Sequence, residues 1–265
     1  MNYKRIELSI KDSIATLTLN HPEVLNAIST RMLEELKDAV AQIGNPAKGI
    51  RCLVITGAGR GFCAGANLTD PARDAGASDD QRLGHSLDET YNPLFLQLRD
   101  LKMPLITAVN GPVAGIGMSL ALMGDMVLAA RSAFFLQAFR RIGLIPDGGA
   151  TFILPRLIGL ARAKELSILA ERLPAEKALE WGLINRVYDD ENLMKETMNL
   201  AEDLAAGPTI SLSLMRQAFW QSPENTYEQQ LHLESVFQTQ AAQSEDAREG
   251  AEAFRQKRPP HFKGK

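Results

Sequence analysis

The chain has 265 residues, of which 45% are hydrophobic and 23% are charged, and its formal net charge at pH 7 is −3. A chain of this length can bury the core of one large domain, or of one domain with a small appendage. Basic residues are not in excess, and no run of lysine or arginine is interleaved with aromatic residues. We therefore expect no nucleic-acid partner.

The two cysteines, Cys52 and Cys63, lack the spacing of metal ligands, and the four histidines are scattered. We therefore expect no metal site and a reducing, cytoplasmic setting. The opening MNYKRIELSI lacks the apolar segment of a signal peptide. No apolar run approaches the roughly 20 residues needed to cross a bilayer, so we expect no membrane contact.

Alternating apolar and polar residues predict two short strands near the start of the chain, at KRIELSI and IATLTLN. Helical periodicity predicts a helix over residues 29–43, with Ser29 or Thr30 as its N-cap. The compact apolar run RCLVITG, residues 51–57, predicts a buried strand that leads into the Gly/Ala-rich loop GAGRGFCAGANL. The polar, irregular residues 70–84 predict a further loop.

The same order of elements then occurs again. A helix is predicted near residues 86–101, followed by the strand LITAVN, the glycine-rich turn and apolar helix GPVAGIGMSLALMGD, and the strand MVLAA. This repetition predicts an α/β fold built from repeated strand–helix units rather than a sandwich. Amphipathic helices follow after about residue 160. We predict a core over residues 1–195 and a helical region over residues 196–265.

Each of the two glycine-rich loops directly follows a predicted buried strand. Neither has the spacing of a dinucleotide-binding or phosphate-binding loop. Each loop alone can be explained as a tight turn, which glycine permits. Two such loops favour a functional interpretation, because main-chain N–H groups from both can converge on one oxygen and form an oxyanion hole.

Four separated motifs, in this order, resemble those of the crotonase superfamily of enoyl-CoA hydratases and isomerases: HPEVLNAIS, GRGFCAGANL, AVNGPVAGIGMSLALMGDMVLAA and FRQKRPPHF. The resemblance covers nearly the whole chain. It implies a crotonase-like spiral of repeated ββα units with a C-terminal helical trimerisation region. It also implies an acyl-CoA substrate, a homotrimer or dimer of trimers, and no cofactor apart from the coenzyme A of the substrate.

The resemblance also implies roles for particular residues. The main-chain N–H groups of Ala66 and Ile116 would hold the thioester oxygen. Residues near coenzyme A would be Leu25, Ala64, Ala66 and Leu68, with Phe254 and Lys257 approaching its phosphates or adenine from a neighbouring subunit. The alternative for Lys257 is simple solvated charge, as is usual in a terminal tail.

The chemistry depends on three positions. Hydratases of the superfamily use two glutamates, and the matching positions hold Ser119 and Phe139. Neither side chain can act as an acid or base in adding water, so hydration is disfavoured. Asp147, in GLIPDGGATFILP, could cap the following helix. The resemblance instead implies that it is the single acid of an isomerase, moving a proton between carbons 2 and 4 of an enoyl thioester.

Further motifs are similar to a branch of the superfamily that isomerises the ring-1,2-epoxide of phenylacetyl-CoA and also shifts enoyl double bonds. They are TGAGRGFCAG, YNPLFLQL, GLIPDGGATFILPR and RPPHFKGK. A ring substrate needs a wide pocket, and the candidate walls are Tyr91, Phe134, Phe135 and Phe139. Core packing is the alternative for these side chains, and we expect it for at least two of them.

Three hypotheses follow. The chain is an acyl-CoA isomerase that uses Asp147, or a hydratase in which Asp147 directs water, or an acyl-CoA-binding protein without catalysis. The missing glutamates count against the second, and the acid at position 147 counts against the third.

Overall fold

The computed structural model describes residues 3–70 and 87–265, so residues 71–84 of the predicted loop lie outside the described part. The larger of two sheets has the strand order β1-β2-β3-β4-β6-β9. β1 and β2 are antiparallel and the other neighbouring strands are parallel. Its strands are β1 (Ile6–Lys11), β2 (Ile14–Leu19), β3 (Cys52–Gly57), β4 (Leu105–Val109), β6 (Met126–Ala130) and β9 (Arg186–Tyr188).

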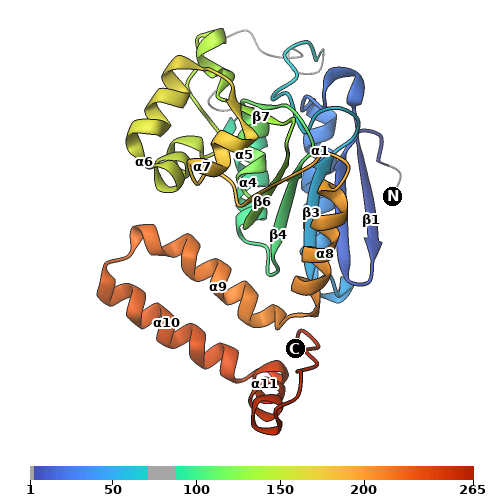
Figure 1. The fold of residues 1–265 in the computed structure, drawn as a ribbon, viewed down its shortest axis with the longest axis vertical. Coiled ribbons are helices and arrows are strands. Elements are labelled where there is room, and N and C mark those ends of the chain that lie inside the picture. The colour runs from blue at the N-terminus through green and yellow to red at the C-terminus, as the bar shows by residue number, and fades with distance from the viewer. Residues whose placement is uncertain (1–2, 71–86) are drawn as a thin grey trace.

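Helices cover both faces of this sheet. All residues of β3 are buried, as expected for a central strand of a parallel sheet. The helix α8 (Leu193–Ala206) contacts five of the six strands and crosses the front of the sheet in Figure 1. The helices α1 (Thr30–Ile43) and α4 (Asn92–Arg99) pack against each other behind it. Ser29 is the N-cap of α1, because its hydroxyl accepts from the N–H of Met32.

A smaller sheet lies beside the carboxyl ends of the long strands, in the order β5-β7-β8. It consists of β5 (Val113–Ala114), β7 (Phe134–Leu136) and β8 (Leu173–Pro174). The helices around it are α5 (Ile116–Ala121), α6 (Ala150–Leu169) and α7 (Ala175–Glu180). Short helical turns complete this part and the earlier loops: η1 (Pro22–Val24), η2 (Pro46–Lys48), the π-helical η3 (Leu87–Tyr91) and η4 (Ala138–Ile142).

The C-terminal helices extend away from the sheet (Figure 1). α9 (Thr209–Gln221) and α10 (Tyr227–Ala242) form a hairpin joined through η5 (Ser222–Glu224), and α11 (Glu245–Gln256) follows. No residue of α10 is buried within the single chain. Among the described residues, no helix is both long and apolar enough to cross a membrane.

The α/β class and the helical C-terminal part that we predicted are confirmed. The helix predicted near residues 86–101 is present as η3 followed by α4. The boundary predicted after residue 195 falls inside α8, which packs on the sheet. That division into two regions stays a prediction.

Candidate active site

The two glycine-rich loops lie side by side. Cys63 in the first forms a parallel bridge with Val113 in the second, and the N–H of Ala114 donates to the carbonyl of Cys63 at 2.9 Å. Gly65 and Gly115 meet at this contact with φ angles of +105° and +53°. A Cβ at Gly65 would lie 3.1 Å from the carbonyl oxygen of Ala114, so a larger residue would force the loops apart.

This contact brings the N–H groups of Ala66 and Ile116 to one cavity. Ile116 is the first residue of α5, where main-chain N–H groups have no partner within the helix. Ala66 forms a parallel bridge with Ile28, in which the hydrogen bonds are made by Gly65 and Asn67 rather than by Ala66 itself. Neither N–H donates to another described residue, and both residues line the cavity. Two free donors at one cavity can stabilise an oxyanion.

The cavity has a volume of about 460 Å³, within the range of small-molecule sites. It lies between the N-terminal turn of α1, the first glycine-rich loop, the start of α5 and the segment from η4 to α6. Its described lining comprises Ile28, Thr30, Leu33, Ala64, Gly65, Ala66, Asn67, Leu68, Asp70, Leu87, Thr90, Tyr91, Gly115, Ile116, Ala138, Phe139, Arg141, Ile142, Leu144 and Asp147.

Asp147 lines this cavity together with the two N–H groups. The N-cap of α6 is Gly149, which makes no side-chain cap, and Asp147 contacts the helix through its main-chain carbonyl, which accepts from Ala150 at 3.1 Å. The same carbonyl accepts from the hydroxyl of Ser119 at 2.8 Å. The main chain of Asp147 is therefore tied both to α6 and to α5, the helix that carries Ile116.

The positions of the two hydratase glutamates lie at the same site. Phe139, in η4, is 6% exposed and lines the cavity with its ring. Ser119 does not line the cavity but is fully buried, and its hydroxyl donates to the carbonyl of Asp147. Among the described lining residues, the carboxylates are Asp70 and Asp147. The carboxylate of Asp70 accepts from the N–H of Thr30 at 2.7 Å, at the first turn of α1.

The residues expected near coenzyme A fall into three groups. Ala64, Ala66 and Leu68 line the cavity. Leu25 does not line it, but its carbonyl accepts from the N–H of Ala64 at 2.9 Å and so holds the loop. Phe254 and Lys257 lie at the end of α11, at the opposite end of the molecule from α5 in Figure 1. One chain therefore does not bring these last two to the cavity.

The four aromatic candidates for ring walls separate in the same way. Tyr91 and Phe139 line the cavity. Phe135 is fully buried in the core, and Phe134 packs beneath the guanidinium of Arg172, 4.6 Å from its ring centre. Phe135 and Phe139 both belong to the buried core, so at least two of the four serve core packing, as we expected, and Phe139 also lines the cavity.

Sequence reasoning did not find several lining residues. Asp70 follows the first loop directly, in NLTD, which is the only local signal for it. Leu87 and Thr90 come from η3, and Arg141 from η4, where its guanidinium donates to the carbonyl of Ala170 at 2.7 Å. Their presence depends on tertiary contacts, so no local pattern predicts them.

The thiol nearest the site is not a nucleophile. Cys63 is fully buried next to Gly65, and burial raises the pKa of its thiol to about 12. A thiol with this pKa is neutral near pH 7. No cluster of three or more metal-ligating side chains occurs in the described ranges.

Two free N–H donors and an acid thus line one cavity, an arrangement suited to stabilising an oxyanion. The comparisons with known proteins agree with such a site. The family model for enoyl-CoA hydratase/isomerase matches residues 9–265. The chain belongs to this family of enzymes, which is the crotonase superfamily suggested by its motifs, and it has the crotonase fold.

Individual relatives include both isomerases and hydratases. The 1,2-epoxyphenylacetyl-CoA isomerase of Escherichia coli is 48% identical over 257 residues, which cover 97% of each chain. The trans-2-decenoyl-[acyl-carrier-protein] isomerase of Streptococcus mutans is 34% identical and covers 100% of each chain. The crystal structure of enoyl-CoA hydratase from Bacillus anthracis has a TM-score of 0.91 and is 31% identical, covering 99% of this chain and 100% of that one.

Proposed function

We propose that the protein isomerises acyl-CoA thioesters, with Asp147 as the group that carries the proton. One observation supports this most directly: Asp147 lines the same cavity as the N–H groups of Ala66 and Ile116. Ser119 and Phe139 occupy the positions where hydratases have glutamates, so the chain lacks their pair of carboxylates.

For a 3-enoyl thioester the proposed reaction is a 1,3-proton shift. The carboxylate of Asp147 takes a proton from carbon 2, and the electrons of that bond move into the thioester carbonyl. The resulting dienolate oxygen accepts hydrogen bonds from the N–H groups of Ala66 and Ile116. Protonated Asp147 then returns the proton to carbon 4, the double bond forms between carbons 2 and 3, and the carboxylate is restored.

The acid and the donors need a fixed relation for this shift. The hydroxyl of Ser119 supports that relation, because it joins α5, which begins at Ile116, to the carbonyl of Asp147. The apolar side chains of Phe139, Ile142 and Leu144 would keep water from the dienolate.

The natural substrate is proposed to be an enoyl thioester, the ring-1,2-epoxide of phenylacetyl-CoA, or both. The ring epoxide is included because the relative from Escherichia coli carries the name of that isomerase at 48% identity. Tyr91 and Phe139 would contact a ring in the cavity. Both reactions are isomerisations, so neither consumes a second substrate.

We also propose that the protein forms a homotrimer or a dimer of trimers. Support comes from α10, which has no buried residue but carries the exposed side chains of Tyr227, Leu231 and Val236. A helix that buries nothing within its own chain yet exposes apolar side chains is suited to contact with another subunit. In such an assembly Phe254, which is 86% exposed, and Lys257 would approach coenzyme A bound to a neighbouring subunit.

The test is incubation of the protein with a 3-enoyl-CoA in heavy water, followed by mass spectrometry. The proposal predicts 2-enoyl-CoA without a hydrated product, and the deuterium content at carbon 4 measures how far the proton on Asp147 exchanges with solvent before it is returned. Accumulation of 3-hydroxyacyl-CoA would instead establish a hydratase. If neither product forms, the ring epoxide is tested next, and no turnover of either substrate would favour a binding protein without catalysis.

A further inference from the structure

A second cavity, of about 640 Å³, lies directly behind the segment that carries Asp147. Gly148 and Gly149 line it, whereas Asp147 lines the candidate active site, so the two cavities lie on either side of one loop. The junction of η3 and α4 likewise lines both cavities. Thr90 and Tyr91 line the active-site cavity, and Asn92 and Phe95 line the second one.

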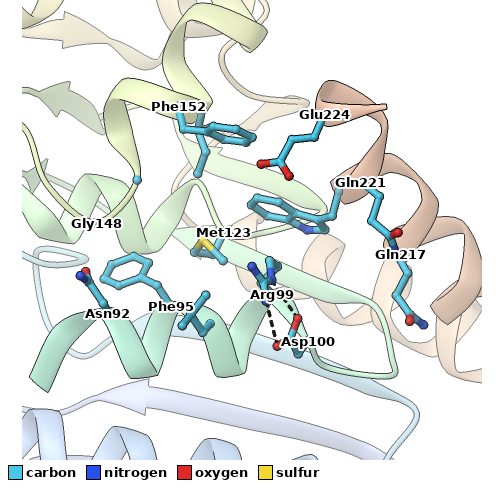
Figure 2. A pocket seen from close by; sticks show the side chains of 14 residues that line it. Asn92, Phe95, Arg99, Asp100, Met123, Gly148, Phe152, Gln217, Gln221 and Glu224 are labelled. Atoms are coloured by element: carbon cyan, nitrogen blue, oxygen red, sulfur yellow. Dashed lines mark hydrogen bonds and ion pairs between the residues drawn. The ribbon is translucent and has the colours of Figure 1, made fainter. Parts of the chain in front are cut away.

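The second cavity is apolar at the end next to the active site. Figure 2 shows Gly148, Phe95 and Asn92 at one end, Met123 and Phe152 in the middle, and Gln217, Gln221 and Glu224 at the other. The ion pair between Arg99 and Asp100 lies toward this polar end. The apolar end is thus suited to hydrocarbon and the polar end to solvent.

The Phe95 ring lines the second cavity and packs against Gly148, next to the segment that carries Asp147. It packs against Gly148 so closely that a Cβ at Gly148 would lie 2.8 Å from Phe95 Cζ, and also 2.8 Å from Ser119 Cβ. Phe95 is 8% exposed, so its ring is held by its surroundings. An acyl chain that continues past Asp147 in this direction therefore meets the ring before it reaches the second cavity.

We infer that Phe95 restricts the active site to compact acyl groups. The cavity behind the ring is then a distal acyl subsite, which long chains would enter only if the ring were removed. This inference rests on the proposed acyl-CoA isomerase function and specifies its substrate class. Compact groups include short enoyl chains and a single ring. Long fatty-acyl chains lie outside the class, because the ring keeps their distal methylenes from reaching the apolar space behind it.

The activity test compares 3-enoyl-CoA substrates of 6 to 14 carbons with the native enzyme and with Phe95→Leu and Phe95→Ala. The native enzyme should lose kcat/KM as the chain grows. Each methylene newly buried is worth about fourfold in kcat/KM. The variants should therefore raise the ratio of long-chain to short-chain kcat/KM by about tenfold or more. Phe134→Leu is the matched control, because Phe134 lines neither cavity, and its ratio should equal that of the native enzyme.

A binding test separates this inference from the proposed function. Trp220 lines the second cavity and Trp181, the other tryptophan of the chain, does not. In a Trp181→Phe background, a saturated acyl-CoA with bromine at its terminal carbon should quench Trp220 fluorescence with Phe95→Leu but not with Phe95 present. This readout needs no turnover, and Phe95→Leu keeps enough bulk to protect folding.

The outcomes are distinct. Equal kcat/KM for short and long chains in the native enzyme would overturn the inference. So would a Phe95→Leu variant that keeps the native dependence of kcat/KM on chain length and shows no quenching of Trp220. Absence of turnover with every chain and with the ring epoxide would contradict the proposed function. Quenching that depends on Phe95 would then still support the subsite.

Discussion

Ser119 illustrates how a position can lose one chemical role and keep a structural one. Its hydroxyl is fully buried and donates to the main-chain carbonyl of Asp147, 28 residues further along the chain. A glutamate at this position would extend a carboxylate toward the substrate. The serine instead joins α5, which begins at Ile116, to the loop that carries Asp147, so under the proposed function it would contribute to geometry rather than to proton transfer.

Ser119→Ala should lower kcat about tenfold and leave KM nearly unchanged, because the carboxylate of Asp147 would be less well positioned while the binding surface stays the same. Its cost in stability should be about 1 kcal/mol, the value of one hydrogen bond. Steady-state kinetics and chemical denaturation measure the two effects. Ser213→Ala removes another buried hydroxyl, far along the chain in α9. An equal loss of kcat in both variants would contradict the positioning role.

At the scale of elements, one buried arginine ties α9 to the core by several contacts. The side chain of Arg216 is 3% exposed and pairs with Asp125, with 2.8 Å from Nε to each carboxylate oxygen. It also donates to the carbonyls of Leu98 and Leu101 at the end of α4. Burial raises the pKa of Asp125, and Arg216 opposes that rise. Loss of Arg216 would therefore raise the pKa of Asp125 further.

Arg216→Ala should destabilise the protein by about 3 to 5 kcal/mol, because it leaves a partly buried carboxylate and several carbonyls without their donor. Urea denaturation measures this loss. Arg255→Ala is the control, since Arg255 also pairs with an acid, Glu252, but its side chain is 70% exposed. The control should lose less than about 1 kcal/mol. Similar losses in the two variants would mean that burial does not strengthen the Arg216 contacts.

The C-terminal tail is attached to α11 by a second carboxylate. Glu249 accepts from the guanidinium of Arg258 at 2.6 Å and from the N–H of His261 at 2.8 Å. The hydrogen bonds from Arg258 are the main cause that lowers the pKa of Glu249 from 4.5 to about 2. A lowered pKa in the folded state means that a released tail binds the proton more readily than an attached one.

The part of the tail attachment that Glu249 supplies should therefore be complete above pH 4.5 and be lost as the pH falls toward 2, while Asp246 also holds the N–H groups of Lys263 and Gly264. The chemical shift of the His261 main-chain N–H, followed by NMR, should titrate with a midpoint near pH 2. Glu249→Gln should remove this titration. A midpoint near the ordinary value of 4.5 would contradict the account, because it would mean that Arg258 does not pair with Glu249 in solution.

At the scale of the whole molecule, the sequence predicts the sheet well because its strands carry local signals. The run CLVITG reads as a buried strand by itself, and so does LITAV. The convergence of Ala66, Ile116 and Asp147 on one cavity followed from motifs that resemble a family, and composition or periodicity could not have predicted it.

The remaining features depend on contacts between distant residues. The bond from Ser119 to Asp147 and the packing of Phe95 on Gly148 join segments that no local pattern relates. Asp70 enters the cavity through its bond to the first turn of α1. The proposed approach of Phe254 and Lys257 to coenzyme A depends on a second chain, so neither the sequence pattern nor a single chain can predict it.

Replacement of Asp147 by asparagine tests the central claim most directly. Asparagine has nearly the same size, so the cavity and its affinity for acyl-CoA should be kept, but its amide cannot accept a proton. The turnover of 3-enoyl-CoA should fall by about 10² to 10⁴-fold, the usual contribution of a general acid–base group. Exchange of the carbon 2 proton with heavy water should fall with it. Turnover by Asp147→Asn equal to that of the native enzyme would contradict the account.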